Sequence, residues 1–525
     1  MTRERTGTSF LDLEAYIFDL DGVLTQTARL HAAAWKGMFD EFLRGRTAGT
    51  GGEAAPFDEG DDYQAYVDGK PRAEGVTGFL ASRGIELPPG DPADAPGRET
   101  VAGLGQRKNE LFHRLLQEQG VEVYPPAVKM VRELRQLGKK VALVTSSRNG
   151  PLIMAAAGLD GLFDAVIDGN AAAERGLKGK PSPDIFLEAS RLLSVSPEVA
   201  AIVEDAVAGV EAGVAGGFGC VLGVDRGGNR VRLEQAGADV VVSDLSRVGR
   251  GLPDATGAVP CLLQEAGGRK LMVFLDYDGT LTPIVSRPEL ALLSPTVRET
   301  LARLAALTPV AVVSGRDVAD VRALVGLDGL IYAGNHGLDI QGPRGVGMQS
   351  EEGTAALPLL AEVEEALWAK LEGVGGVLVE RKRFSIAVHY RLVDDAHLPF
   401  VEQVVDSVLS VHRGLRDVPG KKVHDLRPDI AWDKGRAMAW LLRAQGASRH
   451  TVFPLYLGDD LTDEDAFRFV RGWGAGILVR DGDDRLTLAT MTLAGTQEVE
   501  QFLVQLAAQL AEPAENAREA PEDRP

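Results

Sequence analysis

The sequence predicts an α/β protein with two parallel sheets, each flanked by helices. Two observations support this fold class. Apolar segments of strand length alternate with segments whose apolar residues recur at helical spacing, which favours parallel sheets joined through helices. One arrangement also occurs twice, because a buried strand ends in an Asp-x-Asp-Gly motif at AYIFDLDG and again at LMVFLDYDG. The 525 residues are enough for each half to bury its own core.

In the first half, a helix and two further strands follow the AYIFD strand. The segment VKMVRELRQLG has Val128, Val131 and Leu134 at helical spacing, and KKVALVTSS follows as a buried strand. Later, AAIVED is a strand that ends in Glu204 and Asp205. In parallel sheets of this kind, ligands bind beyond the carboxyl ends of the strands. We therefore expect these acidic residues to lie at a functional site.

The second half has the same order of elements. The segment SPTVRETLARLAAL opens with the Ser-Pro pair typical of a helix start, and PVAVVSG follows as a strand. The later strand PLYLGDD ends in Asp459 and Asp460. The acidic and hydroxyl residues of this half therefore also fall at strand ends.

Composition and charge limit the classes of partner. The formal net charge of −20 disfavours nucleic acid and anionic membranes. The sequence contains no run of about 18 apolar residues, so it predicts no membrane span. The two cysteines, Cys220 and Cys261, have no metal-binding spacing, which fits a reducing cytoplasm, and we expect a cytoplasmic protein. Because the chain as a whole is negative, a site for a phosphorylated substrate would need positively charged groups gathered at that site.

The strand-end residues of the second half suit phosphate-ester hydrolysis. We assign Asp276 as a nucleophile that forms an aspartyl-phosphate and Asp278 as general acid and then base. Mg²⁺ prefers a few carboxylates together with substrate phosphate, so Asp276, Asp278 and Asp459 are its expected ligands. Ser314 of SGR would hold a phosphoryl oxygen. Lys434 of WDKG would balance the phosphate charge.

This ordered set resembles the phosphatases of the haloacid dehalogenase (HAD) superfamily. Within it, the chain from Arg269 to about Leu510 is similar to the trehalose-6-phosphate phosphatases. The segments that carry the resemblance are FLDYDGTLTPIV, VVSGR, AGNHG, VERKRFSIAVHYR, LRPDIAWDKG and LGDDLTDEDAF. The resemblance implies Mg²⁺-dependent hydrolysis of trehalose 6-phosphate. It also implies a smaller α/β cap, inserted between Ser314 and Lys434, that recognises the disaccharide.

The same resemblance implies a set of substrate-binding residues in the second half. They are Arg316, Asn335, His336, Glu380, Lys382, Arg383 and Arg427. An alternative for each single cap residue is a solvated surface position. Family members often have Glu before the Arg-Pro pair, whereas Asp425 and Leu426 precede that pair here, a departure that bears on the Arg427 contact.

A second HAD set lies in the first half. Its catalytic residues are Asp19, Asp21, Thr145 or Ser146, and Lys180, and its metal ligands are Asp19, Asp21, Glu204 and Asp205. The chain from about Ser9 to Val248 resembles the β-phosphoglucomutases. By that resemblance, Thr27, His31 and Trp35 lie at the hinge between the core and a helical cap. The cap residues that would hold a second phosphate are Arg72, Arg107, Lys108 and Asn109.

The resemblances divide the chain into two HAD-type Rossmann-like cores, the first with a helical cap and the second with an α/β cap. The expected domains are 1–250 (mutase-like, cap about 30–125), 251–268 (linker), 269–510 (phosphatase, cap about 340–425) and 511–525 (disordered tail).

We therefore interpret the chain as a trehalose-6-phosphate phosphatase fused to a phosphohexomutase-like domain. Its partners are small sugar phosphates, and a separate trehalose phosphorylase or synthase is a further hypothesis. Three alternatives concern the assignment of activity. In the first, the N-terminal domain is a non-catalytic module that supports the phosphatase. In the second, that domain is a general sugar phosphatase. In the third, the whole chain is a sugar-phosphate sensor with little turnover.

Overall fold

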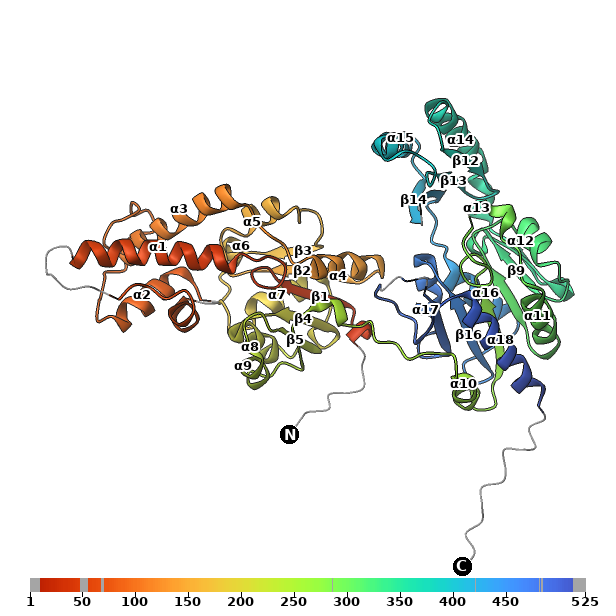
Figure 1. The fold of residues 1–525 in the computed structure, drawn as a ribbon, viewed down its shortest axis with the longest axis horizontal. Helices are drawn as coiled ribbons and strands as arrows, with labels where there is room; N and C mark the ends of the chain where they lie inside the picture. Colours follow the sequence, from red (N-terminus) through yellow and green to blue (C-terminus); the bar gives the residue numbers. More distant parts are fainter. Residues whose placement is uncertain are drawn as a thin grey trace, which may run out of the picture. The chain divides into compact units, whose positions relative to one another are not determined.

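The chain forms two units, Met1–Gly251 and Leu252–Pro525, which we describe separately (Figure 1). The computed structural model describes residues 10–47, 55–67, 70–285, 287–420, 422–480, 482 and 485–512. Of the tail expected to be disordered, residues 513–525 lie outside this range. Among the described residues, no helix is both long and apolar enough to cross a lipid bilayer.

The core of the first unit is a parallel sheet with strand order β3-β2-β1-β4-β5-β6. Its strands are β1 (Ala15–Asp19), β2 (Lys140–Val144), β3 (Ala165–Ile167), β4 (Ala200–Glu204), β5 (Cys220–Val224) and β6 (Val240–Val242). The helices outside the cap are α4 (Pro125–Gln136), α5 (Gly150–Ala157), α6 (Gly169–Glu174), α7 (Asp184–Leu193), α8 (Val207–Ala215) and α9 (Arg230–Gln235). All five residues of β1 are buried, as expected for a central strand covered on both faces.

Three helices form the cap of the first unit: α1 (Ala28–Thr47), α2 (Arg72–Ser82) and α3 (Val101–Gln119). Figure 1 shows them grouped beyond one end of the sheet. They enclose an aromatic cluster in which Phe39 lies against Trp35, Phe57 and Phe79. The two segments through which the chain enters and leaves the cap are hydrogen-bonded to each other. Tyr124 N–H donates to the carbonyl of Leu24 at 2.8 Å.

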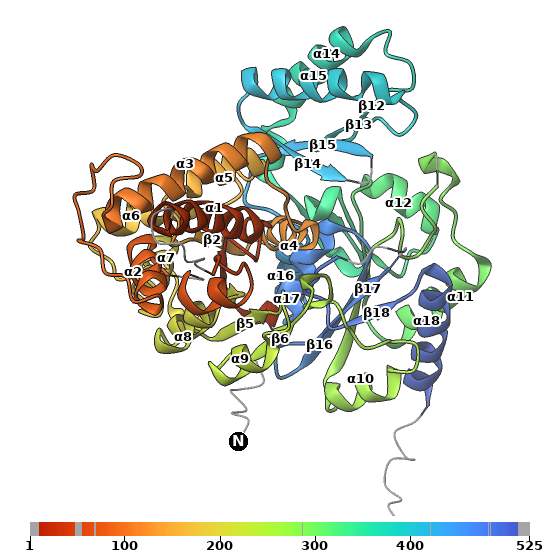
Figure 2. The same ribbon diagram turned by 60° about the vertical axis from the view of Figure 1, so that its left-hand side comes forward.

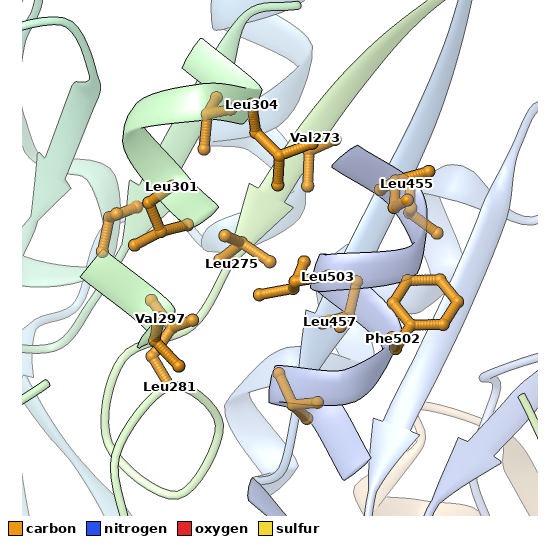
Figure 3. Packing of buried hydrophobic residues seen from close by; sticks show 14 of the residues in the cluster. Val273, Leu275, Leu281, Val297, Leu301, Leu304, Leu455, Leu457, Phe502 and Leu503 are labelled. Carbon is orange, nitrogen blue, oxygen red and sulfur yellow. The ribbon is translucent and has the colours of Figure 1, made fainter. Parts of the chain in front are cut away.

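The second unit has an eight-stranded core sheet with strand order β11-β10-β9-β8-β7-β16-β17-β18. Its strands are β7 (Lys270–Leu275), β8 (Val310–Val313), β9 (Ile331–Gly334), β10 (Asp339–Gln341), β11 (Gly347–Gln349), β16 (Val452–Gly458), β17 (Ala475–Val479) and β18 (Met491–Leu493). The helices of this core are α10 (Val259–Ala266), α11 (Pro295–Leu307), α12 (Val318–Val325), α13 (Glu351–Ala355), α16 (Lys434–Ala444), α17 (Glu464–Val470) and α18 (Thr496–Ala511). Figure 3 shows α11 and α18 packing Leu301 and Leu503 close to Val273 and Leu275 of β7.

The cap of the second unit is an antiparallel sheet with order β12-β13-β15-β14. It consists of β12 (Leu378–Arg381), β13 (Ile386–His389), β14 (Leu415–Gly420) and β15 (Val423–Pro428), with α14 (Leu357–Leu371) and α15 (Leu398–Val411). Figure 2 shows both helices together on one side of these strands. Val379, Val388 and Leu426 are buried in the cluster that the helices complete. The opposite face of the sheet is therefore the one left to polar residues.

Some elements of the structure do not follow the expected domain boundaries. Residues 251–268 were expected to be a linker, but Val259–Ala266 form α10, which packs against α18 of the second unit. The cap was expected at about 340–425, but β10 and β11 pair into the core sheet. The elements of the cap run from Leu357, at the start of α14, to Pro428, at the end of β15.

Candidate active sites

Three neighbouring strands bring the predicted residues of the second half to one edge of the sheet. Asp276 directly follows β7, Ser314 follows β8, and Asp459 follows β16. Strands β8 and β16 both pair with β7 in parallel. Their carboxyl ends therefore meet at the same edge, where α/β sheets bind ligands.

A buried lysine joins this edge to the start of a helix. Lys434, the first residue of α16, places its Nζ 2.7 Å from Asp276 Oδ1 and 2.5 Å from Asp463 Oδ1. Asp463, which is completely buried, was not assigned from the sequence. Its carboxylate also accepts hydrogen bonds from the Tyr456 hydroxyl and, at 2.8 Å, from Asp460 N–H. Asp463 therefore fixes the lysine and the loop after β16 together.

Asp276, Asp459 and Asp463 form a carboxylate group that suits a hard divalent cation. One oxygen from each lies within 4.8 Å of the others. Oxygen ligands of this kind are those that Mg²⁺ prefers. Gly279 leaves room for this carboxylate group because it has no Cβ. A Cβ at this position would lie only 2.2 Å from Asp459 Oδ2. Gly279 also has φ +84°, a conformation that favours glycine.

Asp278, which was also expected among the ligands, is outside this group. The Arg316 guanidinium holds its carboxylate at two points, with Nε and Nη2 each 2.7 Å from a carboxylate oxygen. Arg316 donates further to Asp320 at 3.1 Å and to the carbonyl of Pro288 at 2.9 Å. Burial would lower the pKa of Arg316, but Asp278 and Asp320 hold it above its ordinary value. Asp278 is thus placed by an arginine, with Ser314 accepting from the Arg316 backbone N–H at 3.1 Å.

Electrostatics within the carboxylate group favour an added positive charge. Burial raises the pKa of Asp276 well above its usual range, Lys434 opposes the rise, and Asp463 and Asp459 add to it. Burial acts on Asp463 in the same direction, yet Lys434 and Tyr456 hold its pKa below the usual value. Lys434 contacts only two of the three carboxylates, Asp276 and Asp463, so a bound cation would relieve the repulsion that remains within the group.

Residues of the cap and the core meet beside this site. His336 of the core lies with Nε2 3.5 Å from Asp425 Oδ2 of the cap, and Arg427 Nε donates to the same oxygen at 2.7 Å. Burial lowers the pKa of His336 to about 3, and the charge of Arg427 adds to the effect. Burial would raise the pKa of Asp425, but Arg427 and other cations hold it well below its usual range. The junction thus holds a neutral imidazole against a carboxylate anion.

Asn335 is the other predicted residue of this junction on the core side. Its Nδ2 donates to Asp317 Oδ1 at 2.6 Å, and the Arg383 backbone N–H donates to the same carboxylate at 3.0 Å. Both Asn335 and His336 have positive φ, 49° and 57°. Such a conformation is uncommon outside glycine and is often found where a site over-determines the backbone.

The three remaining predicted cap residues are not equivalent. Glu380 of β12 accepts a hydrogen bond from His389 Nε2 at 2.8 Å, and this bond lowers the pKa of Glu380 with help from Lys382. The charge of Lys382 also acts on Asp425. Arg383, by contrast, directs its guanidinium to Asp339 at 3.3 Å. Glu380 and Lys382 therefore belong to the polar face of the cap, while Arg383 ties the cap to the core.

The first unit repeats the strand-end arrangement around another buried lysine. Lys180 Nζ contacts Asp19 at the end of β1 and lies 2.7 Å from Glu204 Oε2 at the end of β4. Asp19, Glu204 and Asp205 place their ligand atoms within 4.8 Å of one another. Gly22 has φ +87°, and a Cβ there would lie 1.8 Å from Asp205 Oδ2. This carboxylate group has the same suitability for Mg²⁺ as the one in the second unit.

Asp21 was predicted both as an acid–base residue and as a metal ligand, but it lies outside the carboxylate group of Asp19, Glu204 and Asp205. Its carboxylate accepts hydrogen bonds from the Thr27 hydroxyl and, at 3.1 Å, from the Thr145 hydroxyl. His31 Nε2 lies 3.6 Å from it. Burial would raise the pKa of Asp21, but His31 and Thr27 lower it overall. Of the two hydroxyl residues left open by the sequence, Thr145 is the one that contacts Asp21.

Lys108 of the cap reaches this cluster through His31. Its Nζ lies 2.7 Å from His31 Nδ1, and it lies over the rings of Trp35 and Phe112, 5.2 and 4.9 Å from their centroids. Burial lowers the pKa of Lys108 to about 7, and the positive charge of Arg72 adds to the effect. The cap lysine, the hinge histidine and Asp21 therefore form one continuous chain of contacts.

Arg72 and Asn109 make a second connection between cap and core. Arg72 Nη2 donates to Asn109 Oδ1 at 2.9 Å, and the same oxygen accepts from Asn149 Nδ2 of the core at 2.8 Å. His113 Nε2 lies 3.0 Å from Asn149 Oδ1. Asn149 and His113 were not assigned from the sequence, because side chains from separate elements converge there without a spacing pattern. Arg107 is outside this cluster and pairs with Glu41 and Glu110.

Two family models match the chain, one in each half. The trehalose-phosphatase model matches residues 274–493. The model of haloacid dehalogenase-like hydrolases matches residues 13–217. Each match includes the strand-end carboxylates and the buried lysine of its unit.

Curated relatives resemble the whole chain or one half of it. An uncharacterized glycosyl hydrolase of Mycobacterium tuberculosis is 42% identical over 517 residues, 95% of this chain, but this chain spans only 38% of that relative. The trehalose-phosphate phosphatase of Mycobacterium bovis is 41% identical over 340 residues, 63% of this chain and 86% of the relative. The β-phosphoglucomutase of Mycobacterium bovis is 46% identical over 239 residues, 45% of this chain and 91% of the relative.

Proposed function

We propose a function from the premise that this chain belongs to the trehalose-phosphate phosphatases in its C-terminal half and to the β-phosphoglucomutases, HAD-like hydrolases, in its N-terminal half. The chain is an enzyme of the phosphatase class. The C-terminal unit hydrolyses trehalose 6-phosphate to trehalose and phosphate, and the N-terminal unit acts on a hexose phosphate as a mutase.

In the C-terminal unit, Asp276 attacks the phosphorus and forms an aspartyl-phosphate. The bond between phosphorus and the sugar oxygen breaks, and Asp278 donates a proton to that oxygen so that trehalose leaves as an alcohol. Asp278 then takes a proton from water as the water attacks the aspartyl-phosphate. Phosphate leaves and Asp276 is restored. Arg316 supports this cycle because it holds the Asp278 carboxylate at two points.

Lys434 and the carboxylate group organise the phosphate. Asp276, Asp459 and Asp463 would hold Mg²⁺, which when bound supplies positive charge against the phosphoryl oxygens. Lys434 Nζ contacts both Asp276 and Asp463, so it keeps the nucleophile in a fixed rotamer. Ser314, which is buried at the end of β8, offers a hydroxyl to a phosphoryl oxygen.

The observation that most supports a sugar phosphate as substrate is a set of buried polar atoms at the junction of cap and core. Within the described part of the chain, Asn335 Oδ1, His336 Nδ1 and Asp425 Oδ1 have no hydrogen-bond partner. Leaving such atoms unpaired is unfavourable by about 1–3 kcal/mol each. A ligand with many hydroxyl groups would satisfy them. These atoms lie on the loop after β9 and on β15, beside the residues that contact Asp276 and Asp278.

For the N-terminal unit, the contacts between cap and core favour a mutase over a plain phosphatase. Asp19 would be the nucleophile, and Asp21 the acid and base held by Thr27 and Thr145. His31 of α1 lies 3.6 Å from Asp21 of the core, and Asn109 of α3 accepts a hydrogen bond from Asn149 of the core, so the cap has two points of closure on the core. A closed cap keeps water from an aspartyl-phosphate until a sugar hydroxyl takes its place.

Phosphate release from trehalose 6-phosphate in the presence of Mg²⁺ tests this proposal, with glucose 6-phosphate as the comparison substrate. We expect a strong preference for trehalose 6-phosphate. Asp276→Asn should lower its turnover by more than about 10³-fold, because the amide is a poor nucleophile. Turnover of glucose 6-phosphate equal to that of trehalose 6-phosphate would contradict disaccharide recognition. Undiminished hydrolysis by Asp276→Asn would contradict the assigned nucleophile.

A further inference from the structure

Two histidine–carboxylate pairs lie on adjacent strands of the C-terminal cap sheet. His389 Nε2 of β13 is 2.8 Å from Glu380 Oε2 of β12. His424 Nδ1 of β15 is 2.7 Å from Asp417 Oδ2 of β14. The two pairs have nearly the same length, yet they differ in the face of the sheet on which they lie.

The register of the strands assigns the faces. Glu380 lies opposite Ala387, which lies opposite Asp425, so Glu380, His389 and Asp425 share one face. His424 lies opposite Val388 and shares the other face with it. Val388 is buried in the cluster formed with α14 and α15. The His424 pair is therefore on the helix-covered face, and the His389 pair is on the face that meets the core.

Contacts with the core show that the face with Glu380, His389 and Asp425 borders the proposed reaction site. Asp425 lies 3.5 Å from His336 of the core. The charge of Arg316, which holds the general acid Asp278, acts on Glu380 and helps to lower its pKa. Glu380 is thus an anion on the side where the leaving group of the ester must lie. Within the described part of the chain, His389 donates a hydrogen bond to the Glu380 carboxylate.

The pair has the exposure expected of a binding group. The side chains of His389 and Glu380 are 31% and 36% exposed. A carboxylate anion can only accept hydrogen bonds, so His389 must present Nε2–H to it. A pair this exposed contributes little to folding stability, typically about 0–1 kcal/mol. Its main consequence is the orientation of the Glu380 carboxylate.

We propose that His389 is a positioning residue that fixes Glu380 to accept hydrogen bonds from hydroxyl groups of the sugar leaving group. The proposal rests on the function proposed above for the C-terminal unit, and it adds a residue to which the resemblance assigns no role. His389 itself contacts no reacting atom. Its effect is therefore confined to substrates whose leaving group carries sugar hydroxyls, and it is absent for an aryl phosphate.

The test compares trehalose 6-phosphate with p-nitrophenyl phosphate in the full chain, using His389→Leu, His389→Gln and His424→Leu. We expect His389→Leu to lower kcat/KM for trehalose 6-phosphate by about 10-fold or more, mainly through KM, because a charged hydrogen bond is lost. For p-nitrophenyl phosphate, kcat/KM should change by less than about 2-fold, since that ester has no sugar hydroxyl for Glu380. His389→Gln retains an N–H at a similar reach and should recover most of the loss.

His424→Leu is the matched control, because it removes an equally short histidine–carboxylate bond from the opposite face. It should leave the ratio of the two kcat/KM values unchanged. An equal loss on both substrates in His389→Leu would overturn the proposal, as would a glutamine variant no better than leucine. A ratio shifted to the same extent by His424→Leu would also overturn it. Absence of trehalose 6-phosphate turnover in the unaltered chain is a separate outcome, which contradicts the proposed function before any variant is compared.

Discussion

Arg316 and Asp278 form a two-point ion pair in which Nε and Nη2 each lie 2.7 Å from a carboxylate oxygen. This geometry requires a planar guanidinium, since an ammonium group presents a single point of charge. The pair holds the Asp278 carboxylate outside the carboxylate group of Asp276, Asp459 and Asp463. In the proposed mechanism, it therefore separates the acid–base residue from the residues that would hold a cation.

Arg316→Lys should lower kcat for trehalose 6-phosphate about 10- to 100-fold, because it loses one of two charged hydrogen bonds that orient Asp278. Steady-state kinetics will measure the change. Arg322→Lys is the control, because Arg322 of α12 forms an exposed pair with Asp328 at 2.8 Å. Equal effects of the two substitutions would contradict a specific role of the Arg316 pair.

Gly279→Ala should weaken Mg²⁺ binding. The new Cβ would lie 2.2 Å from Asp459 Oδ2, so either the loop or the ligand must move. Gly268→Ala separates this effect from backbone strain, because Gly268 also has positive φ but has no atom within 4 Å of the added Cβ. Both variants should lose about 1–2 kcal/mol of stability. Only Gly279→Ala should raise the Mg²⁺ concentration for half-maximal activity and the Kd for Mn²⁺; unchanged values would contradict the assignment of Asp459.

The stability of the N-terminal unit should rise with pH because of Lys108. Burial and the charge of Arg72 lower the pKa of Lys108 to about 7, whereas its ordinary value is 10.5. Between these values the unfolded chain holds one more proton than the folded chain. The unfolding free energy should therefore rise by about 1.4 kcal/mol per pH unit across this window.

Lys108→Met should remove that slope, and urea denaturation at several pH values in the window measures it. Lys36→Met is the control, because Lys36 forms a partly exposed pair with Asp40 at 3.1 Å in the same cap. Trp35 provides a fluorescence signal close to Lys108. Identical slopes in the unaltered chain and in Lys108→Met would contradict a buried, depressed lysine.

The ion pair between Arg485 and Glu464 should be important for the folding of the C-terminal unit. Both side chains are buried, Arg485 Nη1 lies 2.5 Å from Glu464 Oε1, and Arg485 also donates to the carbonyl of Asp459 at 3.1 Å. Arg485→Leu leaves the glutamate without this partner and should destabilise the unit by about 3–5 kcal/mol in urea denaturation. Arg468→Leu, which removes an exposed pair with Asp465, should change stability by less than about 1 kcal/mol. Similar losses would contradict this account.

The sequence predicts the cores well because strand ends and buried apolar runs carry strong local signals. The predicted strands of both Asp-x-Asp-Gly motifs are confirmed as β1 and β7. The Ser-Pro helix start is confirmed as well, since Ser294 caps α11 by accepting from Val297 N–H. In such elements, local propensity and the final packing agree.

The boundaries were less predictable because short elements carry little periodicity. Strands β10 and β11 have three residues each, which is too few to show an alternating pattern. Helix α10 follows a segment rich in glycine and proline, and its eight residues are held by packing of Leu262 and Ala266. These signals depend on tertiary contacts and are absent from the local sequence.

Several site residues could be found only from the fold. Asp463 has a local signal, the Asp-x-x-Asp spacing of a capping box with Asp460. His389 has none, because its contact with Glu380 depends on the antiparallel register of β12 and β13. Asn149 likewise meets Asn109 across a distance of 40 residues in the chain. The cap contacts therefore needed the structure.

One crossed measurement tests the central claim that each unit has its own activity. Asp276→Asn and Asp19→Asn would each be assayed in the full chain with Mg²⁺, for phosphate release from trehalose 6-phosphate and for conversion of β-glucose 1-phosphate to glucose 6-phosphate. We predict that Asp276→Asn abolishes only the first reaction and Asp19→Asn only the second. Phosphate release that survives Asp276→Asn, or that disappears in Asp19→Asn, would contradict it.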